Sequence, residues 1–210
     1  MHIAPLLRDN LTQFDAFYSI YRVSFPPSEQ KSKEALLAMY TLTSYTIFIA
    51  EDDEIILGFC IVFHDKDADF YLLEYMAVDP QRRDLGIGSQ LFNTSYTYIQ
   101  ERYGLKPLLV EIDSPKSPSL DKALREKRAH FYRKLGAKTI DALEYILPLK
   151  STETPPAMQL LLYHPTLNSI AKQTLQRWLE QLYTNVYGCE ANDARIKTML
   201  HHAPELFHLI

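Results

Sequence analysis

The segment VDPQRRDLGIGSQLF, residues 78–92, decides the fold, because it carries two glycines one residue apart between two apolar stretches. Glycines that open a helix let backbone N–H groups approach a phosphate, and the helix dipole favours the negative charge. A Walker loop would need a Gly-Lys pair, and a dinucleotide-binding fingerprint would need a third glycine. The chain has neither here, so the segment predicts a phosphate loop of another kind.

Patterns on both sides of this loop predict a mixed α/β domain, with helices where apolar residues recur at helical spacing and strands in runs of β-branched and aromatic residues. The expected strands cover residues 2–7, 45–52, 54–65, 69–78, 106–113, 139–149 and 157–165. The expected helices cover residues 9–25, 32–42, the glycine loop to about Tyr103, 120–138, 168–188 and 191–202. Pro5 confines the first strand to a sheet edge, and the apolar strand 69–78 is expected to be central.

The pattern R-x-x-G-x-G between a central strand and a helix resembles the acyl-coenzyme A loop of the GCN5-related N-acetyltransferase (GNAT) family. Arg83, Gly86, Ile87 and Gly88 take its key positions, and Pro80 lies at the expected distance upstream. This pattern alone is common by chance, and the strand, Asp-Pro turn and helix around it make it more specific.

A second motif lies some forty residues further on, in HFYRKLGAK, residues 130–138. The family often carries a phrase like F-Y-x-x-x-G-F in this helix, and Phe131, Tyr132 and Gly136 match it. The resemblance covers residues 1–163 and implies the GNAT-type acyltransferase fold, a mixed, mostly antiparallel central sheet flanked by helices. Residues 164–210 are interpreted as a helical C-terminal extension.

The resemblance implies an enzyme that transfers an acetyl group from acetyl-coenzyme A to an amine of a small molecule, peptide or protein. The amine would attack the thioester directly in a ternary complex. Backbone N–H groups near Ala77 and Val78 would hold the pantetheine arm and polarise the carbonyl. The residues implied to bind acetyl-coenzyme A are Met76, Ala77, Val78, Arg83, Asp84, Leu85, Gly86, Ile87, Gly88 and Ser89.

Tyr132 is implied to be the general acid for the departing thiolate, because a phenol of ordinary pKa ~10 is protonated at neutral pH. Its alternative role is that of a core aromatic residue. Glu74 is the predicted general base, since a carboxylate in a central apolar strand is costly to bury without a purpose. Burial would raise the pKa of Glu74 toward the useful range. Strict alternation would place Tyr75 and Ala77 on the opposite face from Glu74.

Other carboxylates are candidates for the acceptor site. Glu111, on the strand 106–113, is a second candidate base, and the alternative for either glutamate is a structural salt bridge, for example to Arg128. Glu29 lies in FPPSEQ, a segment that in this family often forms one wall of the acceptor site. Glu29 and Glu111 are therefore candidate substrate-binding residues, with a solvated loop charge as the alternative for Glu29.

Arg128 falls on an apolar stripe of its helix and would need a partner if buried, either Glu111, Asp113 or a cofactor phosphate. The stripe is formed by Leu120, Leu124, Phe131 and Leu135. The chain departs from the family pattern at Asp84, where glycine is usual, and at Arg125, where asparagine is frequent. These departures support an alternative function, a non-catalytic acyl-coenzyme A sensor or interaction module.

Composition excludes several other classes. The net charge of −4 and pI near 6.0 argue against nucleic acid as a partner. No apolar run approaches the ~20 residues of a membrane span, and Cys60 and Cys189 are expected to be free thiols, so we expect a cytoplasmic protein. The histidines near the C-terminus do not suggest a metal site. The apolar face of the C-terminal helices predicts either a homodimer or packing on the chain's own domain.

Overall fold

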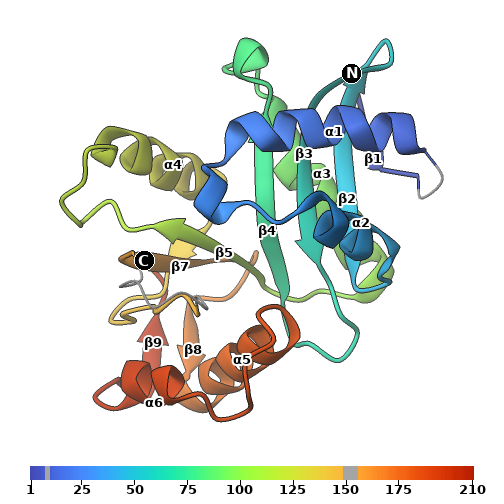
Figure 1. The fold of residues 1–210 in the computed structure, drawn as a ribbon. Helices are drawn as coiled ribbons and strands as arrows, with labels where there is room; N and C mark the ends of the chain where they lie inside the picture. The colour runs from blue at the N-terminus through green and yellow to red at the C-terminus, as the bar shows by residue number, and fades with distance from the viewer. Residues whose placement is uncertain (8–9, 149–155) are drawn as a thin grey trace. The chain divides into compact units, whose positions relative to one another are not determined.

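The computed structural model describes residues 1–7, 10–148 and 156–210. The chain divides into two compact units, and each is described by itself (Figure 1). Unit 1 consists of Met1–Asp67 and Tyr71–Lys106, and unit 2 consists of Ala68–Phe70 and Pro107–Ile210. These units do not correspond to the predicted division into a domain of residues 1–163 and an extension of residues 164–210, and that division stays a prediction.

Unit 1 contains an antiparallel sheet in the order β1-β2-β3-β4. Its strands are β1 (His2–Pro5), β2 (Tyr45–Asp52), β3 (Ile55–Phe63) and β4 (Tyr71–Val78). Pro5 lies on the edge strand, as expected for a residue without a backbone N–H. Asp53 and Glu54 connect β2 to β3 with φ of 47° and 64°, the left-handed conformation that a two-residue hairpin turn requires.

The helices of unit 1 begin and end near the predicted residues. They are α1 (Leu11–Ser24), α2 (Lys33–Thr41) and α3 (Ile87–Tyr103), with short 3₁₀ turns at η1 (Pro27–Glu29) and η2 (Pro80–Arg82). α1 stops before Pro26, because the two prolines that follow cannot continue a helix. α2 is capped by the Ser32 side chain, the first residue of the predicted range 32–42.

Helices cover both faces of the sheet in unit 1 (Figure 1). α1 and α2 pack on the face that carries Ile47, Ile49 and Phe59, where the ring of Phe17 meets that of Phe59 at 4.6 Å. α3 packs on the other face, where Phe48 meets Tyr98 at 5.3 Å.

Unit 2 contains an antiparallel arrangement in which β7 pairs with both β5 and β6. Its strands are β5 (Leu108–Asp113), β6 (Lys138–Thr139), β7 (Met158–Tyr163), β8 (Ser169–Ala171) and β9 (Leu206–His208). Its helices are α4 (Lys122–Lys134), α5 (Lys172–Asn185) and α6 (Ala194–Leu200). α4 ends before Gly136, whose φ of 95° lies in the left-handed region that suits a helix C-terminus, so the helix is shorter than the predicted range 120–138.

Two further predicted elements of unit 2 are shorter than expected. The predicted strand 139–149 is reduced to the two-residue strand β6 with an isolated bridge at Ile140, and its end lies outside the described residues. The tail helix begins at Lys172 rather than at residue 168, because Ser169–Ala171 pairs with β9. The tail was predicted as helical, and it contains two short strands besides its helices.

The apolar face of α5 is buried within unit 2. Its buried residues are Leu175, Trp178, Leu179, Leu182 and Tyr183. The end of the chain is tied to β6 by reciprocal backbone hydrogen bonds, from Thr139 N to Ile210 O at 2.7 Å and from Ile210 N to Thr139 O at 3.0 Å. The tail is thus held within unit 2 by these hydrogen bonds and by contacts of α5 with α6 and β8.

Cys60 and Cys189 are free thiols, as predicted, and burial raises the pKa of Cys60 to about 12. Within the described part of the chain, no helix has both the length and the apolar character needed to cross a membrane.

We expect Phe17→Ala to lower the free energy of unfolding by about 3–5 kcal/mol, because the buried ring leaves a cavity between α1 and the sheet. Val23→Ala, on the exposed side of the same helix, should change it by less than about 0.5 kcal/mol. Urea denaturation followed by circular dichroism measures both. Equal stabilities of the two variants would contradict the packing described for α1.

Candidate active site

The glycine loop joins β4 to α3 within unit 1 and is anchored at both ends. The Asp79 carboxylate accepts a hydrogen bond from Gln81 N at 2.9 Å and starts the η2 turn. At the other end, the Ile87 side chain is buried in the core. The residues between them, 80–86, are exposed, so the backbone of the loop is accessible to a ligand.

The N-terminus of α3 differs from those of the other two α-helices in unit 1. Asn10 caps α1 by accepting from Gln13 N at 3.0 Å, and Ser32 caps α2 by accepting from Ala35 N at 3.1 Å. α3 begins instead at Gly86, in the left-handed conformation with φ of 77°, and no side chain caps it. First-turn N–H groups have no partner within a helix, and an anion can supply one. This N-terminus therefore suits a phosphate.

The departure at Asp84 has a structural explanation. Asp84 has φ of 65°, the left-handed region that glycine adopts without strain and that aspartate tolerates better than most residues. Its side chain is exposed, as are those of Arg83 and Leu85. Gly88 and Ser89 are half-buried in the first turn of α3. The structure thus brings the predicted phosphate-binding residues together at one loop.

The predicted pantetheine segment, Met76, Ala77 and Val78, forms the half-buried end of β4. The first three residues of the strand are buried, and the last five, from Glu74 to Val78, are half-buried. Gly58 on β3 faces this segment, and a Cβ there would lie 2.8 Å from the Ala77 carbonyl oxygen. The glycine lets β3 approach β4 closely at the point where the strand becomes accessible.

Glu74 is a nearly buried carboxylate with one cationic partner. Its side chain is 7% exposed, and Lys31 Nζ lies 3.0 Å from its Oε1. Its Oε2 is buried without a hydrogen-bond partner. Burial raises the pKa of Glu74, and the Lys31 ammonium partly opposes that shift. A carboxylate with a raised pKa can accept a proton from an ammonium group near neutral pH.

Strict alternation along β4 fails at Glu74, and that prediction is wrong. Ile61 pairs with Tyr75 and Val62 pairs with Leu73, so Glu74 is the extra residue of a β-bulge. A bulge places two consecutive side chains on similar sides of a strand. Glu74 and Tyr75 both reach the segment Glu29–Lys31, because the Tyr75 hydroxyl donates to the Glu29 carbonyl oxygen at 2.9 Å.

Three tyrosines surround this carboxylate, and the sequence did not single them out. The Tyr21 hydroxyl accepts from Lys31 N at 2.7 Å, and the rings of Tyr21 and Tyr75 lie 5.1 Å apart. Burial and the Glu74 charge raise the pKa of Tyr45. The three come from α1, β2 and β4, so only the folded sheet gathers them beside Glu74.

In unit 2, Tyr132 lies in the last turns of α4 and is buried, with its ring 5.1 Å from that of Phe131 in an edge-to-face arrangement. Packing of this kind fixes the orientation of a phenol. The geometry is compatible with the role of a positioned general acid and also with that of a core aromatic residue.

Glu111, on β5, carries two tyrosine hydrogen bonds. Its Oε1 accepts from the Tyr145 hydroxyl, and its Oε2 accepts from the Tyr187 hydroxyl at 2.6 Å. Burial and the Glu111 charge raise the pKa of Tyr145 well above its ordinary value. The carboxylate ties β5 to the C-terminal tail, and its role as a base or substrate residue stays a prediction.

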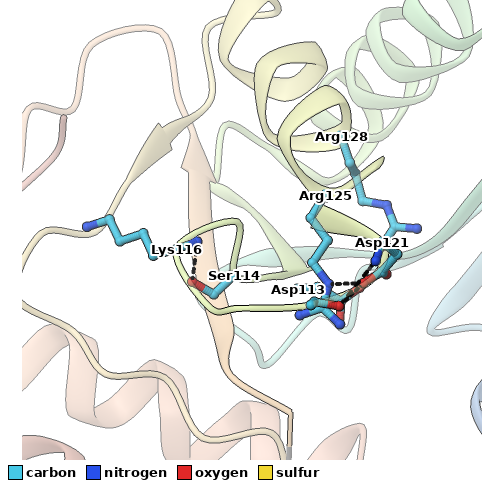
Figure 2. Close-up of polar contacts among 7 residues, drawn as sticks. Asp113, Ser114, Lys116, Asp121, Arg125 and Arg128 are labelled. Carbon is cyan, nitrogen blue, oxygen red and sulfur yellow. Dashed lines mark hydrogen bonds and ion pairs between the residues drawn. The ribbon is translucent and has the colours of Figure 1, made fainter. Parts of the chain in front are cut away.

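Arg128 is the α4 residue that was expected to be buried on an apolar stripe, and this expectation is wrong. Its side chain is 39% exposed, and Leu120 and Leu124 are exposed as well, because the helix buries Ala129 and Tyr132 instead. Figure 2 shows the Arg128 guanidinium directed toward Asp113, with Nη1 at 2.8 Å from Oδ2. The predicted structural ion pair is therefore present.

Arg125, where the family often has asparagine, pairs with Asp121 one turn earlier at 2.9 Å (Figure 2). Asp121 also accepts from the Ser119 hydroxyl. The arginine thus stabilises the first turn of α4. Among the described residues, no group of histidine, cysteine, aspartate and glutamate side chains could hold a metal ion.

Comparison with protein families gives a match over residues 43–136, to the family described as acetyltransferase (GNAT) domain. The matched range contains the glycine loop, Glu74 and Tyr132. A comparison with curated protein sequences gives no match.

Solved structures share the fold at low sequence identity. A Bacteroides thetaiotaomicron protein described as a GNAT-family acetyltransferase aligns with a TM-score of 0.73 and 22% identity, covering 90% of this chain and 100% of its own. An aminoglycoside 6'-N-acetyltransferase complexed with coenzyme A aligns with a TM-score of 0.63 and 22% identity, covering 78% and 96%. The Escherichia coli ribosomal-protein-S18-alanine N-acetyltransferase aligns with a TM-score of 0.57 and 18% identity, covering 79% of this chain and 94% of its own. These alignments confirm the predicted fold.

We expect Tyr187→Phe to destabilise the chain by about 1.5–3 kcal/mol, because it removes a hydrogen bond to the Glu111 carboxylate. If the two groups act as one contact, the double variant Tyr187→Phe with Glu111→Gln should lose clearly less unfolding free energy than the two single variants lose in sum. Urea denaturation of all four proteins measures the coupling. Strict additivity would show that this contact does not hold the tail to β5.

Proposed function

We propose that this chain, which contains an acetyltransferase domain of the GNAT family, transfers the acetyl group of acetyl-coenzyme A to an amine. The family match supports the family and the enzyme class that the sequence predicted, and acetyl-coenzyme A as the co-substrate goes with that family. The amine acceptor and its direct attack in a ternary complex are the parts that we propose.

The observation that carries the proposal is the uncapped N-terminus of α3, which directly follows the half-buried end of β4. Amides of Gly86, Gly88 and Ser89 would hold the pyrophosphate, and Arg83 would add a positive charge. Met76, Ala77 and Val78 would hold the pantetheine arm through backbone groups, next to Asp84, Leu85 and Ile87 of the loop. The left-handed Gly86 and the exposed loop fit such a ligand.

Glu74 would accept the proton of the incoming ammonium, because its raised pKa matches that task and its Oε2 has no other partner. Tyr132 would donate a proton to the departing thiolate. Both assignments are proposals supported by burial and by the motif around each residue. Glu29 and Glu111 remain weaker candidates for contact with the acceptor, since Glu111 already accepts two hydrogen bonds.

The solved acetyltransferases of similar fold are described as acting on aminoglycosides and on the alanine of a ribosomal protein. Both acceptors are amines, which supports an amine acceptor here without naming it. A cationic acceptor fits the Glu74 carboxylate and its aromatic surroundings. A non-catalytic acyl-coenzyme A sensor is the alternative, and Glu74 argues against it because a sensor has no use for a buried base.

The cytoplasm remains the proposed location, because both cysteines are free thiols. Acetyl-coenzyme A and the amine are the proposed partners, with no role for nucleic acid or membranes. A homodimer through the C-terminal helices also stays a prediction. The burial of the α5 apolar face in its own unit leaves that dimer less apolar surface to use.

We expect Arg83→Ala to weaken acetyl-coenzyme A binding by about 10- to 100-fold, which corresponds to the loss of one hydrogen bond to a charged phosphate. Arg82→Ala is the matched control, because Arg82 is the exposed neighbour outside the R-x-x-G-x-G pattern. Calorimetric titration of both variants with acetyl-coenzyme A measures the difference. Equal weakening in both would mean that the basic loop acts only as a diffuse charge.

We expect Glu74→Gln and Tyr132→Phe each to lower kcat by about 100- to 10,000-fold with little change in acetyl-coenzyme A affinity. The wild-type kcat/KM should fall as the pH drops through the raised pKa of Glu74, because only the carboxylate form accepts a proton. The Glu74→Gln variant should lose this dependence. Thiol release over a panel of amines, measured against pH, tests both. Cofactor binding without turnover of any amine would favour the sensor.

A further inference from the structure

The Lys31 side chain places a primary ammonium at the carboxylate that we assign as the base. Lys31 Nζ lies 3.0 Å from Glu74 Oε1, and 31% of the lysine side chain is exposed. The carboxylate is nearly buried and belongs to β4, whereas the lysine belongs to the segment between η1 and α2. These two residues are 43 positions apart in the sequence, and neither the β4 strand nor the segment between η1 and α2 needs their contact in order to form.

The lysine has the chemistry of an acyl acceptor. It is a primary amine on a flexible stem, and it needs to lose a proton before it can attack a carbonyl carbon. Glu74 is the group that would take that proton. The Tyr45 hydroxyl interacts with this carboxylate, and its buried Oε2 makes no hydrogen bond within standard distance. The Tyr21, Tyr45 and Tyr75 side chains enclose the pair with raised pKa values, so they stay protonated and do not compete for the proton.

The lysine contacts the same strand that would hold the thioester. Its partner Glu74 belongs to β4, two residues before Met76, where the proposed pantetheine segment begins. Lys31 comes directly before Ser32, the N-cap of α2, and its backbone N–H donates to the Tyr21 hydroxyl at 2.7 Å. Its backbone is therefore fixed while its ammonium keeps access to solvent.

We propose that Lys31 is an internal acyl acceptor, and that the enzyme acetylates the Nζ of its own Lys31 when no other amine occupies the site. This inference depends on the proposed function. It extends that function, because it assigns a modification site to this chain and identifies a lysine-type primary ammonium as an acceptor that the site can process.

The reaction balances with acetyl-coenzyme A as the only co-reactant. Glu74 takes one proton from the Lys31 ammonium and passes it to solvent. The nitrogen lone pair then forms the bond to the acetyl carbonyl carbon, and the carbon–sulfur bond breaks with its electron pair on sulfur. The thiolate takes a second proton, which leaves one proton on the amide nitrogen. The products are Nζ-acetyllysine at residue 31, free coenzyme A thiol and one proton.

The test incubates the purified full chain with acetyl-coenzyme A in a buffer that contains no amine, and follows it by intact mass and peptide mapping. We expect one acetyl group, at Lys31, at a fractional rate that does not change with protein concentration. Lys31→Arg keeps the positive charge beside Glu74 but should gain no acetyl group there. Glu74→Gln should slow acetylation of Lys31 by about 100-fold or more.

Lys33→Arg is the matched control. Lys33 lies two residues away, is 40% exposed and pairs with Asp15 at 2.7 Å rather than with Glu74. This variant should acetylate Lys31 at the wild-type rate. Equal labelling of Lys31 and Lys33, labelling of the urea-unfolded chain at the same rate, or a rate proportional to protein concentration would overturn the proposal.

Calorimetric titration of the same sample with acetyl-coenzyme A tests the proposed function separately from the inference about Lys31. If acetyl-coenzyme A binds and Lys31 stays unmodified, the inference about Lys31 is wrong while the proposed function stands. If acetyl-coenzyme A does not bind, the proposed function itself fails, and the inference fails with it.

Discussion

The cost of burying the Glu74 carboxylate is the constraint on which the rest of the site depends. A charge in a strand interior is tolerated only with a partner or with a raised pKa, and Glu74 has both. The β-bulge in β4 turns its side chain toward the segment between α1 and α2. Lys31 and the tyrosines from three different elements can gather there because the aromatic core between α1 and the sheet fixes their backbones. The packing of the aromatic core therefore determines the surroundings of the Glu74 carboxylate.

The same strand connects this carboxylate to the phosphate loop. β4 runs from a buried beginning through Glu74 to a half-buried end, and the chain then turns through Asp79 into the uncapped N-terminus of α3. An anion at the helix N-terminus, a ligand along the end of the strand and a base within it would follow one another along a single segment. This order suits a long co-substrate with a pyrophosphate at one end and a thioester at the other. In unit 2, the Glu111 carboxylate accepts a hydrogen bond from Tyr187 and so holds the C-terminal tail, and Tyr132 on α4 stays the proposed general acid.

The sequence predicted what depends on local patterns. The helix expected from residue 32 and the helix start at the glycine loop both follow from the neighbours of each residue. Sequence patterns do not predict features that depend on pairing between distant segments. The bulge at Glu74 arises from the register between two strands, and the Lys31 contact joins segments far apart in the chain. The exposed Leu120 and Leu124 show a different kind of error, because apolar periodicity predicts a buried face there, whereas α4 buries Ala129 and Tyr132.

The central claim is that the β4–α3 segment binds acetyl-coenzyme A with its thioester beside Glu74. A crystal structure of the chain with acetyl-coenzyme A tests it most directly. The account predicts the pyrophosphate within hydrogen-bond distance of the Gly86, Gly88 and Ser89 amides, and the acetyl group along Met76–Val78 on the side of Glu74 and Lys31. A pyrophosphate bound elsewhere, or a thioester directed away from Glu74, would contradict it.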